Sequence, residues 1–334
     1  MGLNIREIVP RKELEFKDLK DEIVAVDAFN ALYQFLSSIR QYDGTPLQDK
    51  KGRVTSHLSG LLYRNMALLT EGIKIIYVFD GEAPALKRGT QEKRSEGKAI
   101  AKEKYESAKE EGDAEGMRKY SSATIKLTEE IIQESKEFLE AMGIAVVQAS
   151  SEGEAQASVI AKNGDAFAVG SQDYDCLLFG APRLIQNLTL ARKRKTNGGV
   201  VDIKPEVIEL KEVLKELGIN QDQLICLGIL VGTDYNPSGI KGIGQKKALK
   251  IVKEHKNPAK IFAEFSEIDF DWKKIFDMFK NPEVNKVSKI KFPNINEDKI
   301  RDILNEHDFS EERIDKQIEK LKLLKGKSKQ KTLF

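Results

Sequence analysis

Short apolar runs, each leading into an acidic residue, alternate with helical patterns in the first half of the chain. The run at 22–26 (EIVAV) is rich in β-branched residues, lacks polar alternation and is followed by Asp27; the run at 73–79 (IKIIYVF) is followed by Asp80. These are the marks of strands buried on both faces of a parallel sheet. Similar runs at 144–148 and 166–170 continue the rhythm. We therefore predict an α/β fold with a central, mostly parallel twisted sheet flanked by helices.

Length and composition set broad limits on the class of protein. The 334 residues, of which 40% are hydrophobic, are enough to bury an ordinary globular core. Cys176 and Cys226 lie in apolar surroundings without a CxxC spacing, so we expect neither a disulfide framework nor a zinc site, but a reducing intracellular compartment. The sequence shows no signal peptide and no apolar run of membrane-spanning length. We expect a soluble protein.

Charge is segregated along the chain although its sum is small. The 55 basic and 53 acidic residues give a net charge of +2, yet residues 87–104 hold seven Lys or Arg against three acids. Residues 192–195 read RKRK, and residues 320–331 hold six Lys and no acid. Such patches suit the phosphate backbone of a nucleic acid. For any single patch, a solvated face or a solubilising tail is an equally good interpretation.

Residues 86–124 lose the apolar periodicity and become rich in Lys, Glu, Arg and Ala, which predicts a charged helical insertion. On a helix Lys87, Arg94, Lys98 and Lys102 fall along one face, where their cations would line a passage for a single strand. Further on, Asn197 and Gly198 form a turn signal inside a predicted β-hairpin. From about residue 205 we expect helices up to the Lys-rich tail.

Acidic residues at or near the predicted strand ends are the main functional signal. Seven stand out by position: Asp27, Asp80, Glu152, Glu154, Asp173, Asp175 and Asp234. In an open α/β sheet the carboxyl ends of the strands share one crevice, so acids far apart in sequence can meet there. Crowded carboxylates repel one another, and bound dications relieve that repulsion. Because the donors are oxygens and the chain has only three His, we predict Mg²⁺ or Mn²⁺ and disfavour zinc.

A structural role is the competing interpretation for each acid taken alone. Ser151 and Glu154 have capping-box spacing at the start of a helical run, so Glu154 has a capping interpretation. A single Asp at a strand end is also more often a cap than a ligand. Capping does not explain two acid pairs with i, i+2 spacing, two strand-end aspartates and a further aspartate before a glycine-rich turn. The joint pattern favours a metal site.

The glycine-rich segment after Asp234 has the order GxxGxG, through Gly239, Gly242 and Gly244, and leads into a basic helical stretch. It does not match the dinucleotide fingerprint GxGxxG, so a Rossmann cofactor site is disfavoured. A tight turn between helices fits, with backbone amides, a helix N-terminus and three lysines placed against phosphates without base readout. Those lysines are Lys246, Lys247 and Lys250. The alternative is a helix C-cap followed by a surface turn.

Six segments together resemble the flap endonuclease family, in the style of its archaeal members. They are VDAFNALYQF, VTSHLSGLLYR, YVFDGEAPALK, SEGEAQAS, SQDYDCLLFG and LVGTDYNPSGIKGIG, in family order and spacing from Met1 to about His255. The resemblance implies a structure-specific 5′ nuclease that hydrolyses DNA phosphodiesters at flap junctions and leaves 5′-phosphate and 3′-hydroxyl ends. It implies roles in Okazaki fragment maturation and repair, 5′–3′ exonuclease activity, and an archaeal cytoplasm or nucleoid, or a nucleus in a eukaryote.

The resemblance also assigns parts of the site. It implies two Mg²⁺ ions, replaceable by Mn²⁺, held by the seven acids, with Lys87 and Arg94 at the scissile phosphate and Tyr33 stacked near the cut; Tyr33 can equally be a core aromatic. Arg40 and Arg64 match family residues near template DNA, and the helix-two-turn-helix at 239–255 would hold K⁺. The implied organisation comprises two halves of a nuclease core (1–85, 125–255), a helical gateway and cap (86–124), a helix-two-turn-helix (239–255), a helical C-terminal region (256–324) and a basic tail (325–334).

The last residues depart from the family pattern. Gln330 and Leu333 begin a sliding-clamp motif of the form Q-x-x-L-x-x-aromatic-aromatic, but the chain stops at Phe334, before the aromatic pair. Either the sequence is a shortened form of the natural chain, or the implied contact with a clamp of the PCNA type is weakened, because aromatic anchors fill the partner's pocket. The alternative is a disordered basic tail.

Three functions are compatible with these residues. The first is a flap endonuclease. The second is a sibling nuclease of the same fold, either a bubble-cutting repair enzyme or a 5′ exonuclease, and the short 86–124 insertion argues against the bubble cutters. The third is a non-catalytic protein that binds branched DNA and keeps the acids for structural reasons.

Overall fold

A mixed sheet forms the centre of the computed structural model, which describes residues 3–42, 44–121, 125–190, 193–196, 199–265, 268–287 and 289–331. Seven strands lie in the order β1 (Lys12–Glu13), β9 (Glu206–Glu209), β6 (Arg183–Gln186), β5 (Ala168–Gly170), β2 (Ile23–Asp27), β3 (Lys74–Phe79) and β4 (Ala145–Gln148). The strands from β6 to β4 are parallel, and β9 and β1 add an antiparallel edge. The predicted fold class is confirmed.

Strand β9 corrects the expectation that the chain is helical from about residue 205. Its four residues alternate too briefly to predict a strand, and the pairing with β6 puts Ile208 opposite Leu184. Val207 and Ile208 are then buried on opposite faces of the sheet. The non-local partner, which the local pattern does not contain, determines the strand.

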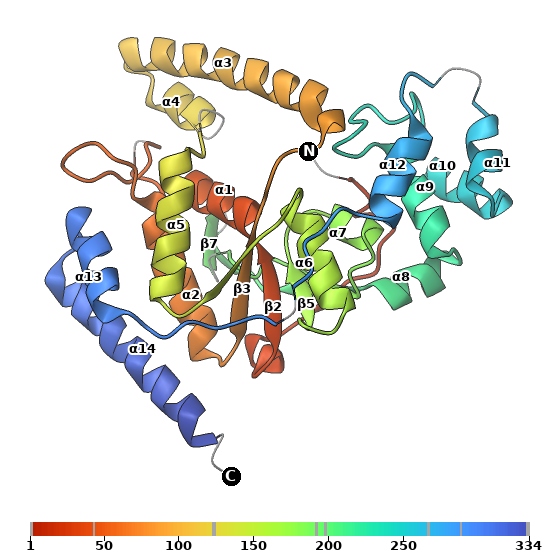
Figure 1. The fold of residues 1–334 in the computed structure, drawn as a ribbon. Coiled ribbons are helices and arrows are strands. Elements are labelled where there is room, and N and C mark those ends of the chain that lie inside the picture. Colours follow the sequence, from red (N-terminus) through yellow and green to blue (C-terminus); the bar gives the residue numbers. More distant parts are fainter. Residues whose placement is uncertain are drawn as a thin grey trace.

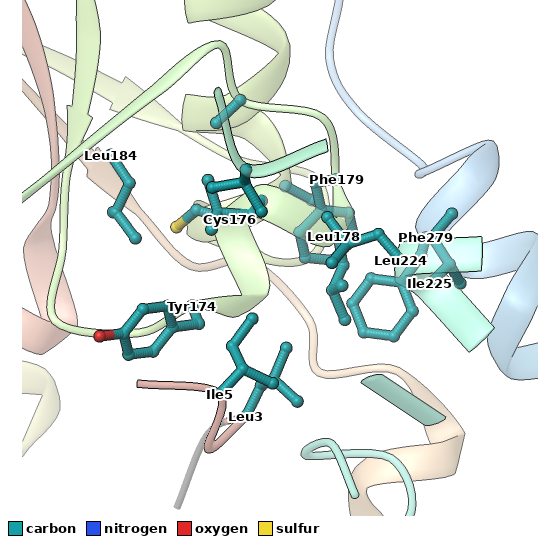
Figure 2. Close-up of a cluster of buried hydrophobic side chains, with 14 of the residues drawn as sticks. Leu3, Ile5, Tyr174, Cys176, Leu178, Phe179, Leu184, Leu224, Ile225 and Phe279 are labelled. Atoms are coloured by element: carbon teal, nitrogen blue, oxygen red, sulfur yellow. The ribbon is translucent and has the colours of Figure 1, made fainter. Parts of the chain in front are cut away.

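Apolar side chains cover both faces of the sheet, as the runs without polar alternation predict. On β3, Tyr77 faces the layer of α1 (Ala28–Ser38), α2 (Ser56–Thr70) and α5 (Glu129–Ala141), and Ile76 faces the opposite layer. That opposite layer contains α6 (Gly153–Lys162), α7 (Asp175–Leu178), α8 (Leu210–Leu217) and α9 (Gln221–Val231). Figure 2 shows part of it, with side chains of α7 packed against those of α9 and α12 (Trp272–Lys280).

The charged segment after β3 is helical. It contains a 3-10 turn, η2 (Ala85–Lys87), then α3 (Arg88–Glu110) and α4 (Ala114–Ser121). In Figure 1 these two helices stand away from the sheet, beyond the end of β3 that leads into them. The predicted hairpin is present as β7 (Lys193–Thr196) paired with β8 (Gly199–Asp202), and its turn residues Asn197 and Gly198 lie outside the described residues.

Helices dominate the remainder of the chain. They are α10 (Gln245–Glu254), α11 (Pro258–Ala263), α13 (Glu297–Glu306) and α14 (Glu311–Lys331), besides α12. The segment between α12 and α13 crosses the molecule in Figure 1. It is fixed to α6 by Asn285, which donates its N–H to Gln156 Oε1 at 2.7 Å and accepts from Gln156 Nε2 at 3.1 Å.

Leu333, Phe334 and the Gln330 side chain lie outside the described residues. None of the helices in the described ranges combines the length and apolar character that crossing a bilayer demands.

A buried polar network joins α13 to α2 and α5. Glu134 accepts from His57 at 2.7 Å and from His307 at 2.5 Å, and His307 also contacts Asp49 at 3.2 Å. Burial alone would raise the pKa of Glu134, but these histidine contacts outweigh it and lower the pKa to about 2. The ionised carboxylate is therefore favoured by folding.

Glu134→Gln should destabilise the fold by about 2 kcal/mol near neutral pH, because the amide loses the charge-assisted contacts. Since the folded-state pKa lies below the ordinary value of 4.5, the stabilisation is complete above that value and disappears as the pH falls towards 2. Urea unfolding of both proteins across this pH range measures the difference. Glu137→Gln, one turn along α5 in an exposed pair with Lys299, is the matched control and should have little effect.

Candidate active site

Asp27, at the end of β2, caps helix α1 and also belongs to the candidate site. Asp27 is 4% exposed, and its Oδ1 accepts the N–H of Asn30 at 3.0 Å, which caps α1. Its Oδ2 accepts from Ser171 Oγ at 3.4 Å, at the end of the neighbouring strand β5. The capping and site interpretations of this aspartate are therefore compatible.

Asp80, after β3, holds the start of α6 in place. Its Oδ1 accepts the N–H of Gly153 at 2.7 Å, and a Cβ at position 153 would lie 2.6 Å from the same oxygen. The N-cap residue of α6 is Glu152, without a side-chain cap bond of its own. The competing capping interpretation of Ser151 and Glu154 therefore does not hold, because the carboxylate of Asp80 binds the free amide of Gly153.

Asp173 and Asp175 follow β5. Asp173 Oδ2 accepts from Asn30 Nδ2 at 3.0 Å, and the Asp173 N–H donates to Ser171 Oγ at 3.2 Å. Asp175 begins α7 and is 4% exposed, and its Oδ1 is buried without a hydrogen bond from any residue that the structure describes. A buried carboxylate oxygen without a hydrogen bond needs a further partner.

Lys87 brings a cation among these acids. Its Nζ pairs with Oε1 of Glu152 and lies 3.6 Å from Oδ2 of Asp234, which follows α9. The other oxygen of Glu152 accepts the hydroxyl of Tyr235. Residues from three distant parts of the sequence therefore meet at one point.

Six of the seven acids line a single cavity of about 660 Å³. They are Asp27, Asp80, Glu152, Glu154, Asp173 and Asp234. Asp175 does not line the cavity, but it lies close enough to Asp173 and Asp234 for their charges to raise its pKa. The structure thus brings together the acids that the strand ends predict to meet.

Burial and mutual repulsion dominate the electrostatics of this carboxylate cavity. Burial, followed by the charge of Asp80, raises the pKa of Asp27 to about 8, and burial with Asp173 raises that of Asp175 to about 8. Burial likewise raises the pKa of Asp80, Asp173 and Glu154. Burial alone would lower the pKa of Lys87, but the surrounding carboxylates raise it. The cavity therefore favours positive charge.

The donor set fits hard dications. It consists of carboxylate oxygens, and one of them, Oδ1 of Asp175, is buried without a hydrogen bond among the described residues. Within those same ranges, no three acidic, histidine or cysteine side chains are grouped tightly enough to enclose one ion. The ammonium of Lys87 supplies charge compensation in this arrangement. A bound dication would supply the same charge compensation to these carboxylates.

Basic and aromatic side chains border the carboxylate cavity on the side of α3. Tyr33 is 37% exposed and lines the cavity, so it is not the core aromatic that its apolar run allowed. Lys98 also lines it, with its Nζ 3.5 Å from the Tyr33 hydroxyl and 5.1 Å from the ring centroid. Lys102 is exposed on α3. Arg94 belongs to α3, but its side chain lies outside the described residues.

The remaining predicted residues lie away from the cavity lining. Arg40 donates from Nε to the carbonyls of Leu36 and Ser37 at 3.0 Å and from Nη1 to Gly44 at 2.6 Å, so it closes the end of α1. Arg64 is half-buried on α2. The glycines occupy the turn between α9 and α10, where Gly239 and Gly242 have φ of 53° and 78°. The three lysines of α10 are exposed: Lys246, Lys247 and Lys250.

Sequence reasoning missed Asn30, Lys126 and Tyr235. Asn30 donates to Asp173 and also accepts the N–H of Gln172 at 3.3 Å, and Lys126 lines the cavity. Tyr235 contacts Glu152. A local signal existed for Asn30, a polar residue in the first turn of the helix after Asp27, and for Tyr235, the neighbour of Asp234. Lys126 has no such signal.

Comparisons with known proteins match the sequence and the fold of this chain. The XPG N-terminal domain matches residues 4–101 and the XPG I-region residues 143–234. Flap endonuclease 1 of Pyrococcus furiosus is 52% identical over 336 residues, with 100% of this chain and 98% of the relative covered. The structure of flap endonuclease-1 from Methanococcus jannaschii has a TM-score of 0.77 at 41% identity and covers 98% of this chain and 100% of its own. The catalytic core of Rad2 bound to a DNA substrate shares the fold, with a TM-score of 0.71 at 23% identity and coverage of 96% and 100%.

The fold and the carboxylate cavity thus define a DNA nuclease of the XPG type, a phosphodiester hydrolase. A role in DNA replication and repair is consistent with the relatives that this chain matches. The chain belongs to the flap endonuclease family. Among the three functions compatible with the sequence, the non-catalytic DNA binder is thereby excluded.

Proposed function

We propose that the carboxylate cavity binds two divalent cations, Mg²⁺ with Mn²⁺ as a substitute, and hydrolyses a DNA phosphodiester at the junction of a 5′ flap. Asp27, Asp80, Glu154, Asp173, Asp175, Glu152 and Asp234 would hold the ions. When bound, such ions supply a nucleophile at neutral pH and stabilise charge on the reacting phosphate. The observation that carries the proposal is the meeting of six of these acids with Lys87 in one cavity, with Asp175 beside it.

The chain's own cations would act on the phosphate. Lys87, once released from Glu152 and Asp234, would donate to a non-bridging oxygen of the scissile phosphate and offset the charge that develops there. Arg94, two turns further along α3, would donate to the same phosphate. Tyr33, half-exposed at the cavity wall, offers a ring face on which the nucleotide beside the cut would stack. A 5′–3′ exonuclease activity would use the same groups at a nick.

The surrounding helices would guide the DNA. Lys98, Lys102 and the exposed charges of α3 would lie along the single strand, and Arg40 and Arg64 would lie nearer the template strand. The turn through Gly239, Gly242 and Gly244, with α10 behind it, would contact the duplex backbone and bind K⁺. The C-terminal residues Gln330, Leu333 and Phe334 would contact a sliding clamp through their side chains.

Replacing both Lys246 and Lys247 by Ala should weaken DNA binding uniformly across sequences and flatten its salt dependence. Each lost phosphate contact removes about one unit from the slope of log K against log salt concentration. Fluorescence anisotropy of a flap substrate over a salt series measures that slope. Lys273→Ala on α12, whose Nζ lies 5.7 Å from the Trp272 ring, is the control. An unchanged slope in the double variant would exclude α10 as a phosphate contact.

Substrate preference separates the flap endonuclease from its siblings. Flap, bubble and nicked duplex substrates of equal sequence are incubated with the protein and Mg²⁺, and initial rates are compared. We expect the flap to be cleaved fastest, because the insertion formed by α3 and α4 is short and Lys98 of α3 lines the cavity. Faster cleavage of the bubble or of the nicked duplex would assign the chain to the corresponding sibling activity.

A further inference from the structure

Tyr235 is a buried aromatic residue at the edge of the carboxylate cavity. It follows Asp234 in the turn after α9 and is 8% exposed. With Glu152 it lines an adjoining cavity of about 390 Å³ on the side of α12. Tyr235 therefore stands between the acids and the C-terminal helices.

Two charged side chains of the cavity contact this one phenol. The Tyr235 hydroxyl donates to Oε2 of Glu152, whereas Oε1 of the same carboxylate pairs with Lys87. The Nζ of Lys87 also lies 5.4 Å from the centroid of the Tyr235 ring. The hydroxyl thus fixes one oxygen of Glu152 and leaves the other turned towards the cation, while the ring face attracts that cation.

The ring is itself held by α12. Phe279 packs edge-on against Tyr235 with ring centroids 5.3 Å apart at 75°, and Phe179 lies 4.8 Å from Phe279. Figure 2 shows Phe179 and Phe279 next to each other in the buried cluster. Aromatic packing of this kind restricts the ring to one orientation. The direction of the hydroxyl towards Glu152 is therefore set by packing outside the cavity.

We propose that Tyr235 is a positioning residue that orients Glu152 as an ion ligand and holds Lys87 beside it. A ligating carboxylate whose second oxygen is hydrogen-bonded is held in its ligand geometry before the ion arrives, and loss of such a partner weakens ion binding. The cation–π contact keeps the ammonium at the cavity wall when an ion displaces it from the carboxylate. The inference rests on the proposed ion site, because it assigns Glu152 to that site.

Tyr235→Phe tests the role of the hydroxyl, since it keeps the ring and its packing on Phe279. Mn²⁺ binding is titrated by electron paramagnetic resonance without DNA, and we expect about tenfold weaker binding than for the wild-type chain. On a flap substrate at fixed Mg²⁺, kcat should fall while KM for the DNA stays unchanged, because Tyr235 is not placed against DNA. The thermal unfolding midpoint in EDTA should remain near the wild-type value.

Tyr77→Phe is the matched control. Tyr77 is also buried, and its hydroxyl donates at 2.8 Å to Asn65, on the opposite face of the sheet from α6. That variant should lose stability and keep Mn²⁺ affinity. If Tyr235→Phe binds Mn²⁺ as tightly as the wild-type chain, the positioning role is wrong although the ion site stands. If the wild-type chain itself binds no Mn²⁺, the proposed ion site fails and the inference fails with it.

Discussion

Asp175→Ala should lose at least about 100-fold in cleavage rate, because removing an outer partner of a metal ligand already costs 10- to 100-fold and this residue is proposed as a ligand. DNA affinity should persist, since the lysines of α10 and α3 are untouched. Removing a buried charge from a repelling group should also leave the fold intact in EDTA. Single-turnover cleavage and binding in Ca²⁺ measure the two properties separately.

Asp165→Ala is the control for this loss. Asp165 is exposed at the other end of β5 from Asp173, so the same side-chain change there should leave cleavage as it is. Asp175→Asn adds a variant of nearly unchanged shape. Wild-type turnover in both Asp175 variants would exclude this aspartate from the ion site, whatever the other acids do.

Lys87→Met should reduce single-turnover cleavage by about 100- to 1,000-fold, the usual loss when one donor to a developing negative charge is removed. Divalent-ion binding should be retained or tightened, because the ammonium that pairs with Glu152 and lies 3.6 Å from Asp234 no longer competes for those oxygens. This opposite response of rate and ion affinity separates a phosphate donor from a residue that merely holds the acids together. Mn²⁺ titration alongside the cleavage assay tests both parts.

Lys109→Met provides the matched change at the far end of α3, where the lysine is exposed. It should behave as the wild-type chain in both measurements. If Lys87→Met instead loses ion binding together with cleavage, Lys87 is a structural counter-charge and not a donor to the phosphate.

The parallel strands and their acids could be predicted because their signals are local and repeated. A run without polar alternation that leads into an acid, as before Asp27 and Asp80, contains both the buried strand and the position of its end. That these acids meet at one edge of the sheet then follows from the geometry of parallel strands. Strand β9 could not be predicted in this way, because its four residues become a strand only against β6.

The residues that support the acids were harder to predict, because their roles depend on neighbours distant in sequence. Gly153 receives its cap from Asp80, 73 residues earlier, although Ser151 has the local capping spacing. Tyr235 contacts Glu152 across 83 residues, and its ring is held by Phe279. No spacing rule contains such contacts. The acids are therefore visible in the sequence, whereas the contacts of the side chains that orient them are visible only in the fold.

Product mapping on a 5′-labelled double-flap substrate, with Mg²⁺ and with EDTA, tests the central claim most directly. If the acids form a divalent-ion site that cuts DNA, one dominant labelled product should end near the junction of single and double strand in Mg²⁺, and EDTA should abolish it. Cleavage that persists in EDTA, or no cleavage in either Mg²⁺ or Mn²⁺, would contradict the account.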